Sequence, residues 1–330
     1  MNRAQTVILP ILVLAVGACQ GSTEPETSSA PIAATSTPSA EPISLEGRIL
    51  LGLDTLYVAN ADGSDPQQVY APGAYCCADR ISPDRTRILV MPGTDDTGSV
   101  RGGTLALDGT DFALLPRPDE TLNLVPQAWS PDGERIAFEG WDESDPSRTG
   151  IYTARVDGTD LRRVTTSPGL PHDTALDYSP DGTQLVFYRA VRAEPDFPID
   201  IGGSLWVVNV DGSDAHELDT GDVRPWWTAR WSPDGSTIVF TEERLQPTGA
   251  IWTINPDGSN LTKVFEDPEG RFARAPVWSP DGSRIMFYLH PISDNFQHDP
   301  NEIYAINANG SGLTLVIGGP TYKYVMEWWE

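Results

Sequence analysis

The segment 288–302 gathers residue types that could bind a metal ion. Its potential ligands are His290, Asp294, His298, Asp299 and Glu302. Imidazole and carboxylate groups of this kind can coordinate Zn²⁺ or Mn²⁺. Their spacing matches no established metal motif, so a solvated polar loop is the favoured interpretation and a metal site is the alternative. The sequence also lacks the fingerprints of serine hydrolases, zinc proteases, P-loop enzymes and dinucleotide enzymes. We therefore expect no cofactor.

Two adjacent tryptophans, Trp226 and Trp227, could contact a ligand. An indole ring can stack against a sugar or a peptide side chain while its N–H finds a polar partner. Tryptophans that enter a strand more often pack in a core. Packing is therefore the favoured interpretation of this pair, and ligand contact is the alternative.

Cys76 and Cys77 are also neighbours in the chain. Consecutive Cα atoms lie about 3.8 Å apart, below the roughly 4.4–6.8 Å that is usual for a disulfide. A bond between them would be strained, so two plain thiols near the start of a strand are favoured. A vicinal disulfide is the alternative, because an oxidising compartment would not leave free thiols unmodified. A metal or redox role has no support from a C-x-x-C spacing.

A repeated phrase identifies the elements that carry these residues. The phrase is an aromatic or apolar residue followed by S-P-D-G, with S-P-D-R in the copy nearest the N-terminus. Its copies begin at Ile81, Trp129, Tyr178, Trp231 and Trp278. The copies lie roughly 50 residues apart, a period typical of propeller blades. In each copy an apolar strand precedes a tight turn, which is Pro-Asp-Gly in all copies but the first, and a second apolar strand follows it.

Each repeat continues with a third strand that ends in an Asp-Gly or Asn-Gly hairpin signal and with a short fourth strand. The hairpin signals stand at Asp62, Asp108, Asp157, Asp211, Asp257 and Asn309. There are six hairpins but only five S-P-D phrases, because the first copy begins in its second strand. The segment 324–330 can supply the missing first strand. The repeat pattern therefore predicts that residues 43–330 form an all-β, six-bladed propeller of four-stranded antiparallel blades. The C-terminal strand is expected to close the ring by pairing with the first blade.

These W-S-P-D-G turns, together with the third strands and their D-G hairpins, resemble the TolB-type β-propeller repeat family. The resemblance covers nearly all of the chain from residue 44 onward and implies the propeller fold. The family's namesake carries a further α/β domain and works in the Tol-Pal envelope complex. No such domain is expected here, so the resemblance does not imply the Tol-Pal role.

The strand order places the long, divergent loops on one face of the ring and the uniform turns on the other. Loops held on a rigid scaffold are where binding usually occurs. The candidate ligand face therefore carries His172, Trp226, Trp227, His290 and His298.

The N-terminal segment predicts export. Residues 7–16 are apolar but too short to span a bilayer, which needs about 20 residues, so residues 1–18 read as a signal peptide. The sequence V-G-A-C ending at Cys19 resembles the bacterial lipobox, in which the cysteine is lipidated. Residues 19–42 are rich in Ser, Thr, Pro and Ala and cannot form a core. We expect an exported lipoprotein, tethered outside the cytoplasmic membrane on the periplasmic or cell-surface side.

Charge and composition limit the partners. A formal charge of −25 argues against binding nucleic acid or an anionic lipid surface, so membrane contact is expected only through Cys19. The favoured function is a non-catalytic binding or scaffold module for an envelope protein or glycan, acting as a monomer. The alternative is a metal-dependent lyase or hydrolase with its site at the mouth of the central channel, as some TolB-type propellers have. The sequence lacks the inward histidine in each blade that this would favour.

Overall fold

A computed structural model describes residues 45–52, 55–69, 75–91, 102–167, 172–192, 200–243, 249–291, 299–321 and 323–330. For residues 75–79, 91, 191–192 and 200–201 only the backbone is described. Within these residues, no helix has the length and apolar character needed to cross a membrane.

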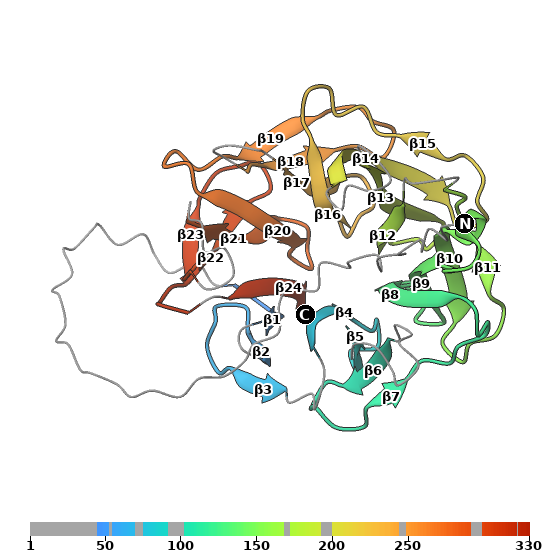
Figure 1. The fold of residues 1–330 in the computed structure, drawn as a ribbon. Coiled ribbons are helices and arrows are strands. Elements are labelled where there is room, and N and C mark those ends of the chain that lie inside the picture. The colour runs from blue at the N-terminus through green and yellow to red at the C-terminus, as the bar shows by residue number, and fades with distance from the viewer. Residues whose placement is uncertain are drawn as a thin grey trace, which may run out of the picture.

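Six four-stranded antiparallel sheets form a ring (Figure 1), and each sheet is one blade. Each blade begins with its innermost strand and ends with its outermost strand. Blade 1 is β24 (Tyr324–Trp329), β1 (Arg48–Gly52), β2 (Leu56–Asn60) and β3 (Gln67–Val69). Blade 2 is β4 (Tyr75–Ile81), β5 (Arg87–Met91), β6 (Gly103–Ala106) and β7 (Ala113–Leu114). Blade 3 is β8 (Asn123–Trp129), β9 (Arg135–Trp141), β10 (Gly150–Arg155) and β11 (Arg162–Arg163), with the short 3₁₀ helix η1 (Pro146–Arg148) between β9 and β10.

Blade 4 is β12 (Asp173–Tyr178), β13 (Gln184–Arg192), β14 (Asp200–Asn209) and β15 (His216–Glu217). Blade 5 is β16 (Pro225–Trp231), β17 (Ile238–Glu242), β18 (Ile251–Ile254) and β19 (Thr262–Phe265). Blade 6 is β20 (Phe272–Trp278), β21 (Arg284–His290), β22 (Glu302–Asn307) and β23 (Thr314–Ile317). The predicted six-bladed propeller is confirmed.

The C-terminal strand closes the ring, as predicted. β24 pairs antiparallel with β1, from Arg48 opposite Trp329 to Gly52 opposite Tyr324. The indole Nε1 of Trp328 donates to the Glu46 carbonyl at 2.9 Å. Trp328 also packs in a cluster that contains β1 residues and Met286 of blade 6. Closure therefore rests on both a strand ladder and a buried aromatic side chain.

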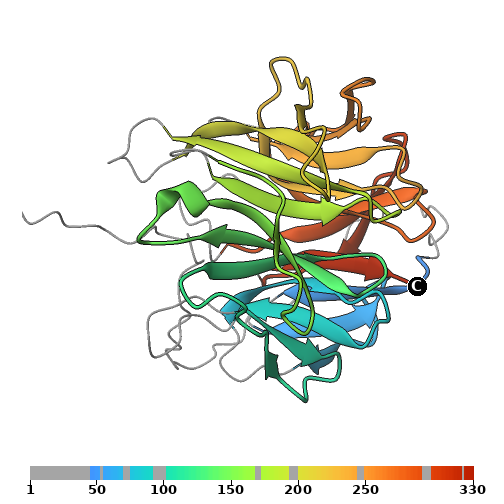
Figure 2. The ribbon, with the colours of Figure 1, turned by 90° about the vertical axis from the view of Figure 1, so that its right-hand side faces the viewer.

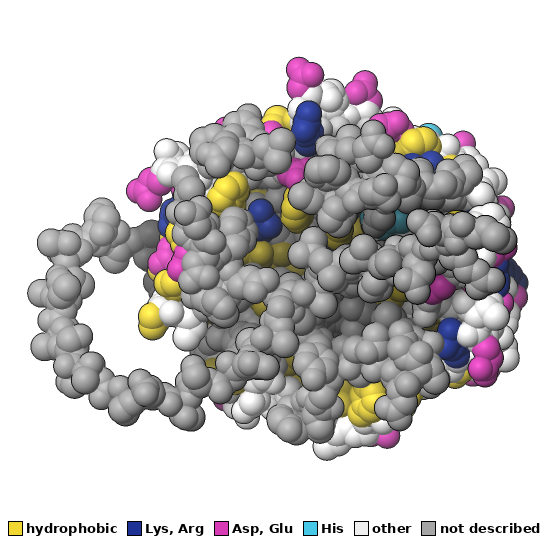
Figure 3. Space-filling model, in the orientation of Figure 1, with side chains coloured by type: hydrophobic (Ala, Val, Ile, Leu, Met, Phe, Trp, Pro, Cys, Tyr) yellow, Lys and Arg dark blue, Asp and Glu magenta, His cyan; other side chains and the backbone are white. Residues whose placement is uncertain are grey.

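The ring has two different faces, seen edge-on in Figure 2. The S-P-D turns and the C-terminal Glu330 lie on one face, which we name the turn face. On the opposite face, the loop face, the innermost strands begin and the second strands end. Figures 1 and 3 look onto the loop face. This is the predicted separation of uniform turns from long connections.

The S-P-D-G phrase is held by hydrogen bonds within the phrase itself. In blade 3 the Ser130 hydroxyl donates to Asp132 Oδ1 at 2.5 Å and accepts from the Arg135 backbone N–H at 2.9 Å. Gly133 has a φ of 72°, a conformation that favours glycine. The serine therefore links the turn to the start of the second strand, which explains why the turn needs a serine as well as Pro-Asp-Gly.

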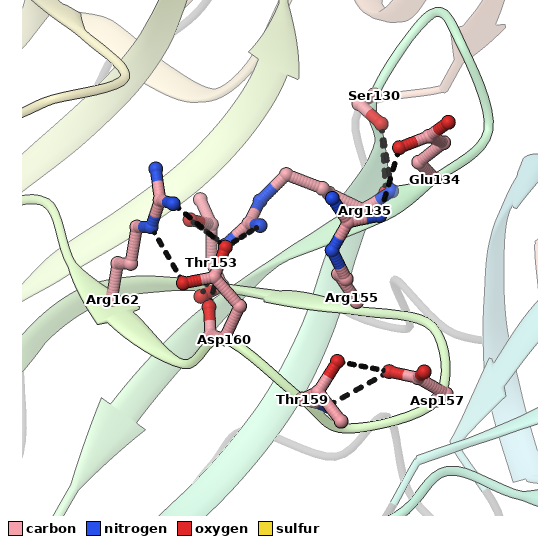
Figure 4. Close-up of polar contacts among 9 residues, drawn as sticks. All are labelled: Ser130, Glu134, Arg135, Thr153, Arg155, Asp157, Thr159, Asp160 and Arg162. Atoms are coloured by element: carbon pink, nitrogen blue, oxygen red, sulfur yellow. Dashed lines mark hydrogen bonds and ion pairs between the residues drawn. The ribbon is translucent and has the colours of Figure 1, made fainter.

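The hairpin between the third and fourth strands lies beside that turn and is tied to it by an arginine (Figure 4). Asp157 Oδ1 accepts from the Thr159 N–H at 2.9 Å and from its hydroxyl at 2.6 Å. Arg135 Nη1 donates to Asp160 Oδ2 at 2.8 Å. Blade 2 repeats this contact between Arg87 and Asp111 at 2.8 Å. The turn face is thus built from repeated structural contacts.

Candidate ligand-binding face

Aromatic and basic side chains gather where the innermost strands of blades 5 and 6 begin, on the loop face. We name them the mouth cluster: His172, Trp226, Trp227, Phe272 and Arg274. In Figure 3, hydrophobic and basic side chains are visible together over β16 and β20.

Trp226 is the centre of this cluster. The guanidinium carbon of Arg274, on the neighbouring blade, lies 5.1 Å from the centroid of the Trp226 ring. The same carbon lies 5.5 Å from the Phe272 ring. The ring of Trp227 stacks beside that of Trp226 with centroids 6.1 Å apart and planes 22° from parallel. Cation–π contacts of this geometry hold an arginine against an indole, so Trp226 and Arg274 form one unit across two blades.

Trp227 extends the cluster towards blade 4. Its ring meets the edge of the His172 ring at a centroid distance of 6.0 Å. It lies equally far from the ring of Tyr188, which is buried. Trp227 also packs against the apolar core between blades 4 and 5. Both tryptophans are half-buried, but Trp227 packs against that core cluster and Trp226 does not, so the structural role favoured by the sequence fits Trp227.

The other predicted candidates that the structure describes lie in blade 6, where β21 ends and β22 begins. His290 lies at the end of β21 on the loop face but is fully buried, with Nδ1 2.7 Å from the Pro291 carbonyl oxygen. Asp299 is partly exposed, and Glu302 accepts from the Tyr304 hydroxyl and from Arg271. Across the described part of the chain, no group of three His, Cys, Asp or Glu side chains could hold a metal ion.

Several predicted site residues fall outside what the structure describes. Asp294, His298 and Cys19 lie outside the described residues. Cys76 and Cys77 belong to β4, but their side chains are not described. Predictions that rest on these residues stay predictions.

Sequence reasoning overlooked Arg274 and Phe272. A signal was available, because Arg274 stands four residues before Trp278 just as Trp227 stands four residues before Trp231. An alignment of the blades on the aromatic residue of the repeated phrase would have placed Arg274 and Trp227 at equivalent positions in the innermost strands of neighbouring blades.

The sequence of this chain also matches a model of a protein family with this arrangement of blades and turns. Residues 54–320 match the family model described as the TolB beta propeller domain. The chain belongs to this family. The match covers most of the ring.

Two curated relatives share part of this sequence. An uncharacterized peptidase, YuxL, of Bacillus subtilis is 29% identical over 161 residues, which is 43% of this chain and 22% of the relative. A TolB homolog of Chlorobium luteolum is 30% identical over 155 residues, which is 46% of this chain and 32% of the relative. The chain thus spans a third or less of the length of these relatives.

Solved structures support the fold. TolB from Acinetobacter baumannii superposes with a TM-score of 0.63 at 17% identity, over 86% of this chain and 67% of that chain. An oligogalacturonate lyase from Vibrio parahaemolyticus superposes with a TM-score of 0.54 at 14% identity, over 80% of this chain and 71% of that chain. At these identities the likeness shows a shared propeller and nothing about the ligand.

Proposed function

We propose that this protein is a non-catalytic binding or scaffold module that presents the loop face of its propeller to an envelope protein or glycan. The observation that carries the proposal is the mouth cluster. The turn face uses its charged residues to hold its own turns, as Arg135 does with Asp160. The mouth cluster sets a half-buried indole of blade 5 against a guanidinium of blade 6 on the loop face.

The chemistry of the cluster suits a ligand with both apolar and oxygen-rich parts. The guanidinium of Arg274 can donate to carboxylate or hydroxyl oxygens. The ring edges of Trp226 and Phe272 offer apolar surface beside it. A glycan and an extended protein loop each combine these two properties. Membership of the TolB beta propeller domain family supports a role in the cell envelope.

The N-terminal segments give this proposal its cellular context. We propose that residues 1–18 are a lipoprotein signal peptide, that Cys19 is lipidated, and that residues 19–42 tether the propeller outside the cytoplasmic membrane. A flexible chain of this length holds its cargo on the order of 25–30 Å from the anchor. The loop face could then reach partners in the adjoining envelope.

A metal-dependent lyase or hydrolase at the channel mouth is the second candidate function. It is supported by a short stretch of sequence, 64 residues at 36% identity and 19% of this chain, shared with an oligogalacturonide lyase of Pectobacterium atrosepticum. Metal analysis of the purified protein, followed by a lyase assay on oligogalacturonides with and without Mn²⁺, tests it directly. Stoichiometric metal together with metal-dependent product formation would establish this function in place of simple binding.

The binding proposal is tested with two variants on the loop face and one control. Trp226→Ala and Arg274→Gln remove the two central members of the cluster, and Arg135→Gln removes a comparable arginine from the turn face. Binding is measured on an array of bacterial envelope glycans and by pull-down from envelope extracts. Because central Trp and Arg residues often contribute about 2 kcal/mol or more to an interface, each loop-face variant should weaken binding about 30-fold.

The control separates the two faces. Arg135→Gln should bind as the wild type does, provided that it melts at a similar temperature. If folded Arg135→Gln loses the partner while Trp226→Ala and Arg274→Gln keep it, the ligand binds the turn face and the proposal is wrong.

A further inference from the structure

The side chain of His216 joins the outer parts of two neighbouring blades. His216 opens β15, the outermost strand of blade 4, and is half-buried. Its Nδ1 lies 3.0 Å from the Asp214 carbonyl oxygen, and its Nε2 lies 3.0 Å from the Pro256 carbonyl oxygen. Pro256 belongs to the hairpin between β18 and β19 of blade 5. Since blades 4 and 5 are separate sheets, the second contact links two blades that share no strand ladder.

The contact with Asp214 has counterparts in other blades, whereas the contact with Pro256 is an addition to the repeat. Thr262 of blade 5 and Thr314 of blade 6 also stand four residues after the hairpin glycine. Each donates its hydroxyl to the carbonyl two residues earlier, at 3.0 Å and 3.1 Å. A threonine hydroxyl has one proton to donate, but an imidazole ring has two nitrogens. His216 therefore keeps the local contact and adds one to the next blade.

The two contacts together fit a protonated ring. Both partners of His216 are carbonyl oxygens, which accept hydrogen bonds and cannot donate them. A neutral imidazole carries one N–H, so its second nitrogen would turn a lone pair towards a carbonyl oxygen. An imidazolium donates from both nitrogens. The geometry of His216 therefore requires the ring to hold two protons if both bonds are to form.

We propose that His216 is a proton-dependent clasp between blades 4 and 5. Its imidazolium ties β15 to the blade 5 hairpin, and loss of a proton breaks one of the two bonds. The hairpin already packs closely here, because a Cβ added to Gly258 would lie 3.3 Å from the Asp219 backbone nitrogen. Blades 4 and 5 also share the core cluster against which Trp227 packs. The clasp therefore stabilises a junction that supports part of the mouth cluster.

The charges around His216 favour its protonated form. In residues 210–219 and 255–261 every carboxylate-bearing or cationic side chain other than His216 is acidic: Asp211, Asp214, Glu217, Asp219 and Asp257. β14, which pairs with β15, adds only Asp200 at its far end. Glu217 acts on Arg189, which is itself paired with Asp173.

The hydrogen bonds and these charges act on the ring in the same direction. The bond to the Pro256 carbonyl raises the pKa of His216 above its ordinary value of 6.5, as do the bond to Asp214 and the charges of Asp214 and Asp257, while burial opposes the shift. Since the folded protein holds the proton more tightly than the unfolded chain, the clasp stabilises the fold fully below pH about 6.5. This contribution is lost as pH rises through the folded-state pKa.

NMR titration of the full chain between pH 5.5 and 8.5 tests the geometry. The His216 ring signal is the one absent from His216→Thr, a substitution to the residue that blades 5 and 6 have at this position. Its pKa should lie above 6.5. The Asp257 amide shares a peptide unit with the Pro256 carbonyl, so its chemical shift should change with the same midpoint as the ring. It should not do so in His216→Thr, and the equivalent amide of Asn309 in blade 6 should not do so in either protein.

Urea unfolding of the same two proteins tests the effect on stability. The two proteins share every other titrating group, so the ratio of their unfolding constants isolates His216. The constant of the wild type relative to that of His216→Thr should stay level below about pH 6, rise above pH 6.5 by up to tenfold per pH unit, and level off above the folded-state pKa. A ratio that is constant from pH 5.5 to 8.5, or that falls as pH rises, would overturn the proposal.

Asp257→Asn separates the two-carbonyl geometry from a simple charge effect. Asn309 occupies this position in blade 6 and bonds Ser311 as Asp257 bonds Ser259, so the hairpin should keep its shape. The pKa of His216 should fall in this variant but stay above 6.5. A His216 pKa at or below 6.5 in the wild type or in Asp257→Asn, or an Asp257 amide that titrates no more than that of Asn309, would show that the clasp does not form.

Discussion

Replacing Trp328 by alanine should destabilise the whole propeller by opening its closure. This side chain is 6% exposed and packs among Ile49 of β1 and Met286 and Ile303 of blade 6. It also donates to the Glu46 carbonyl. Its loss therefore leaves a cavity between blades 1 and 6 and removes a hydrogen bond at the point where the two ends of the ring meet.

The expected magnitude follows from that burial. Replacing a buried tryptophan by alanine costs about 3–5 kcal/mol. For a ring of this size 1 kcal/mol corresponds to about 2 °C, so the midpoint of thermal unfolding should fall by about 6–10 °C. Trp328→Phe keeps most of the volume but loses the N–H donor. Glu46 is exposed, so water can replace the lost donor and only the net value of one hydrogen bond, about 0.5–1.5 kcal/mol, is lost. This variant should therefore melt about 1–3 °C below the wild type.

Calorimetry of the purified protein, with Trp fluorescence as a second probe, measures both variants. Leu315→Ala is the control, because that side chain is 49% exposed on β23 of blade 6 and should change stability by no more than about 0.5 kcal/mol. From highest to lowest, the midpoints should be those of the control, the phenylalanine variant and the alanine variant. If Trp328→Ala melts within a degree or two of Leu315→Ala, closure does not depend on this side chain and the reasoning fails.

Three further changes test other parts of the molecule. Cys19→Ala should move the protein from the membrane fraction to the soluble fraction and abolish acyl labelling; a labelled, membrane-bound variant would contradict lipidation. Gly212 has a φ of 85°, and an added Cβ would lie 2.8 Å from the Val164 carbonyl oxygen, so Gly212→Ala should lower the free energy of unfolding in urea by roughly 1–3 kcal/mol. Gly221→Ala, which meets nothing within 4 Å, should cost less, and equal losses would refute the clash. The Asp157 carboxylate accepts hydrogen bonds from the hydroxyl and the backbone N–H of Thr159, and these bonds lower its pKa. The ionised Asp157 carboxylate stabilises the fold above pH about 4, and this contribution is lost below it. The thermal midpoint should therefore fall between pH 5 and 3. A midpoint that stays constant over that range would contradict this account.

The sequence predicted the repeating unit because the relevant signals are local. Each S-P-D-G phrase and each D-G hairpin sets its own backbone conformation through contacts within five residues, as Ser130 does with Arg135 and Asp157 with Thr159. The sequence contains six hairpins but only five first strands with their turns, so one blade lacked a first strand. The segment 324–330 was the remaining apolar segment that could complete blade 1. The closing pairing of β24 with β1 could therefore be predicted even though its partners lie at opposite ends of the chain.

The functional surfaces could not be predicted in the same way. The loop face was predicted from strand order, but the contact of Arg274 with Trp226 joins residues of different blades. The contact of His216 with the Pro256 carbonyl also joins two blades and spans 40 residues. No local pattern marks such pairs.

The physical reason lies in the innermost strands. The register between first and second strands shifts at an irregularity in every blade, for example between Ala175 and Asp177 in blade 4 and between Arg274 and Val277 in blade 6. A bulge displaces the alternation of side chains, so residues beyond it face the other way from what a regular strand predicts. The sequence by itself determined the blades, their number and their closure. Only the tertiary structure decided which side chains point to the channel, because that depends on where each bulge falls and on which blade stands opposite.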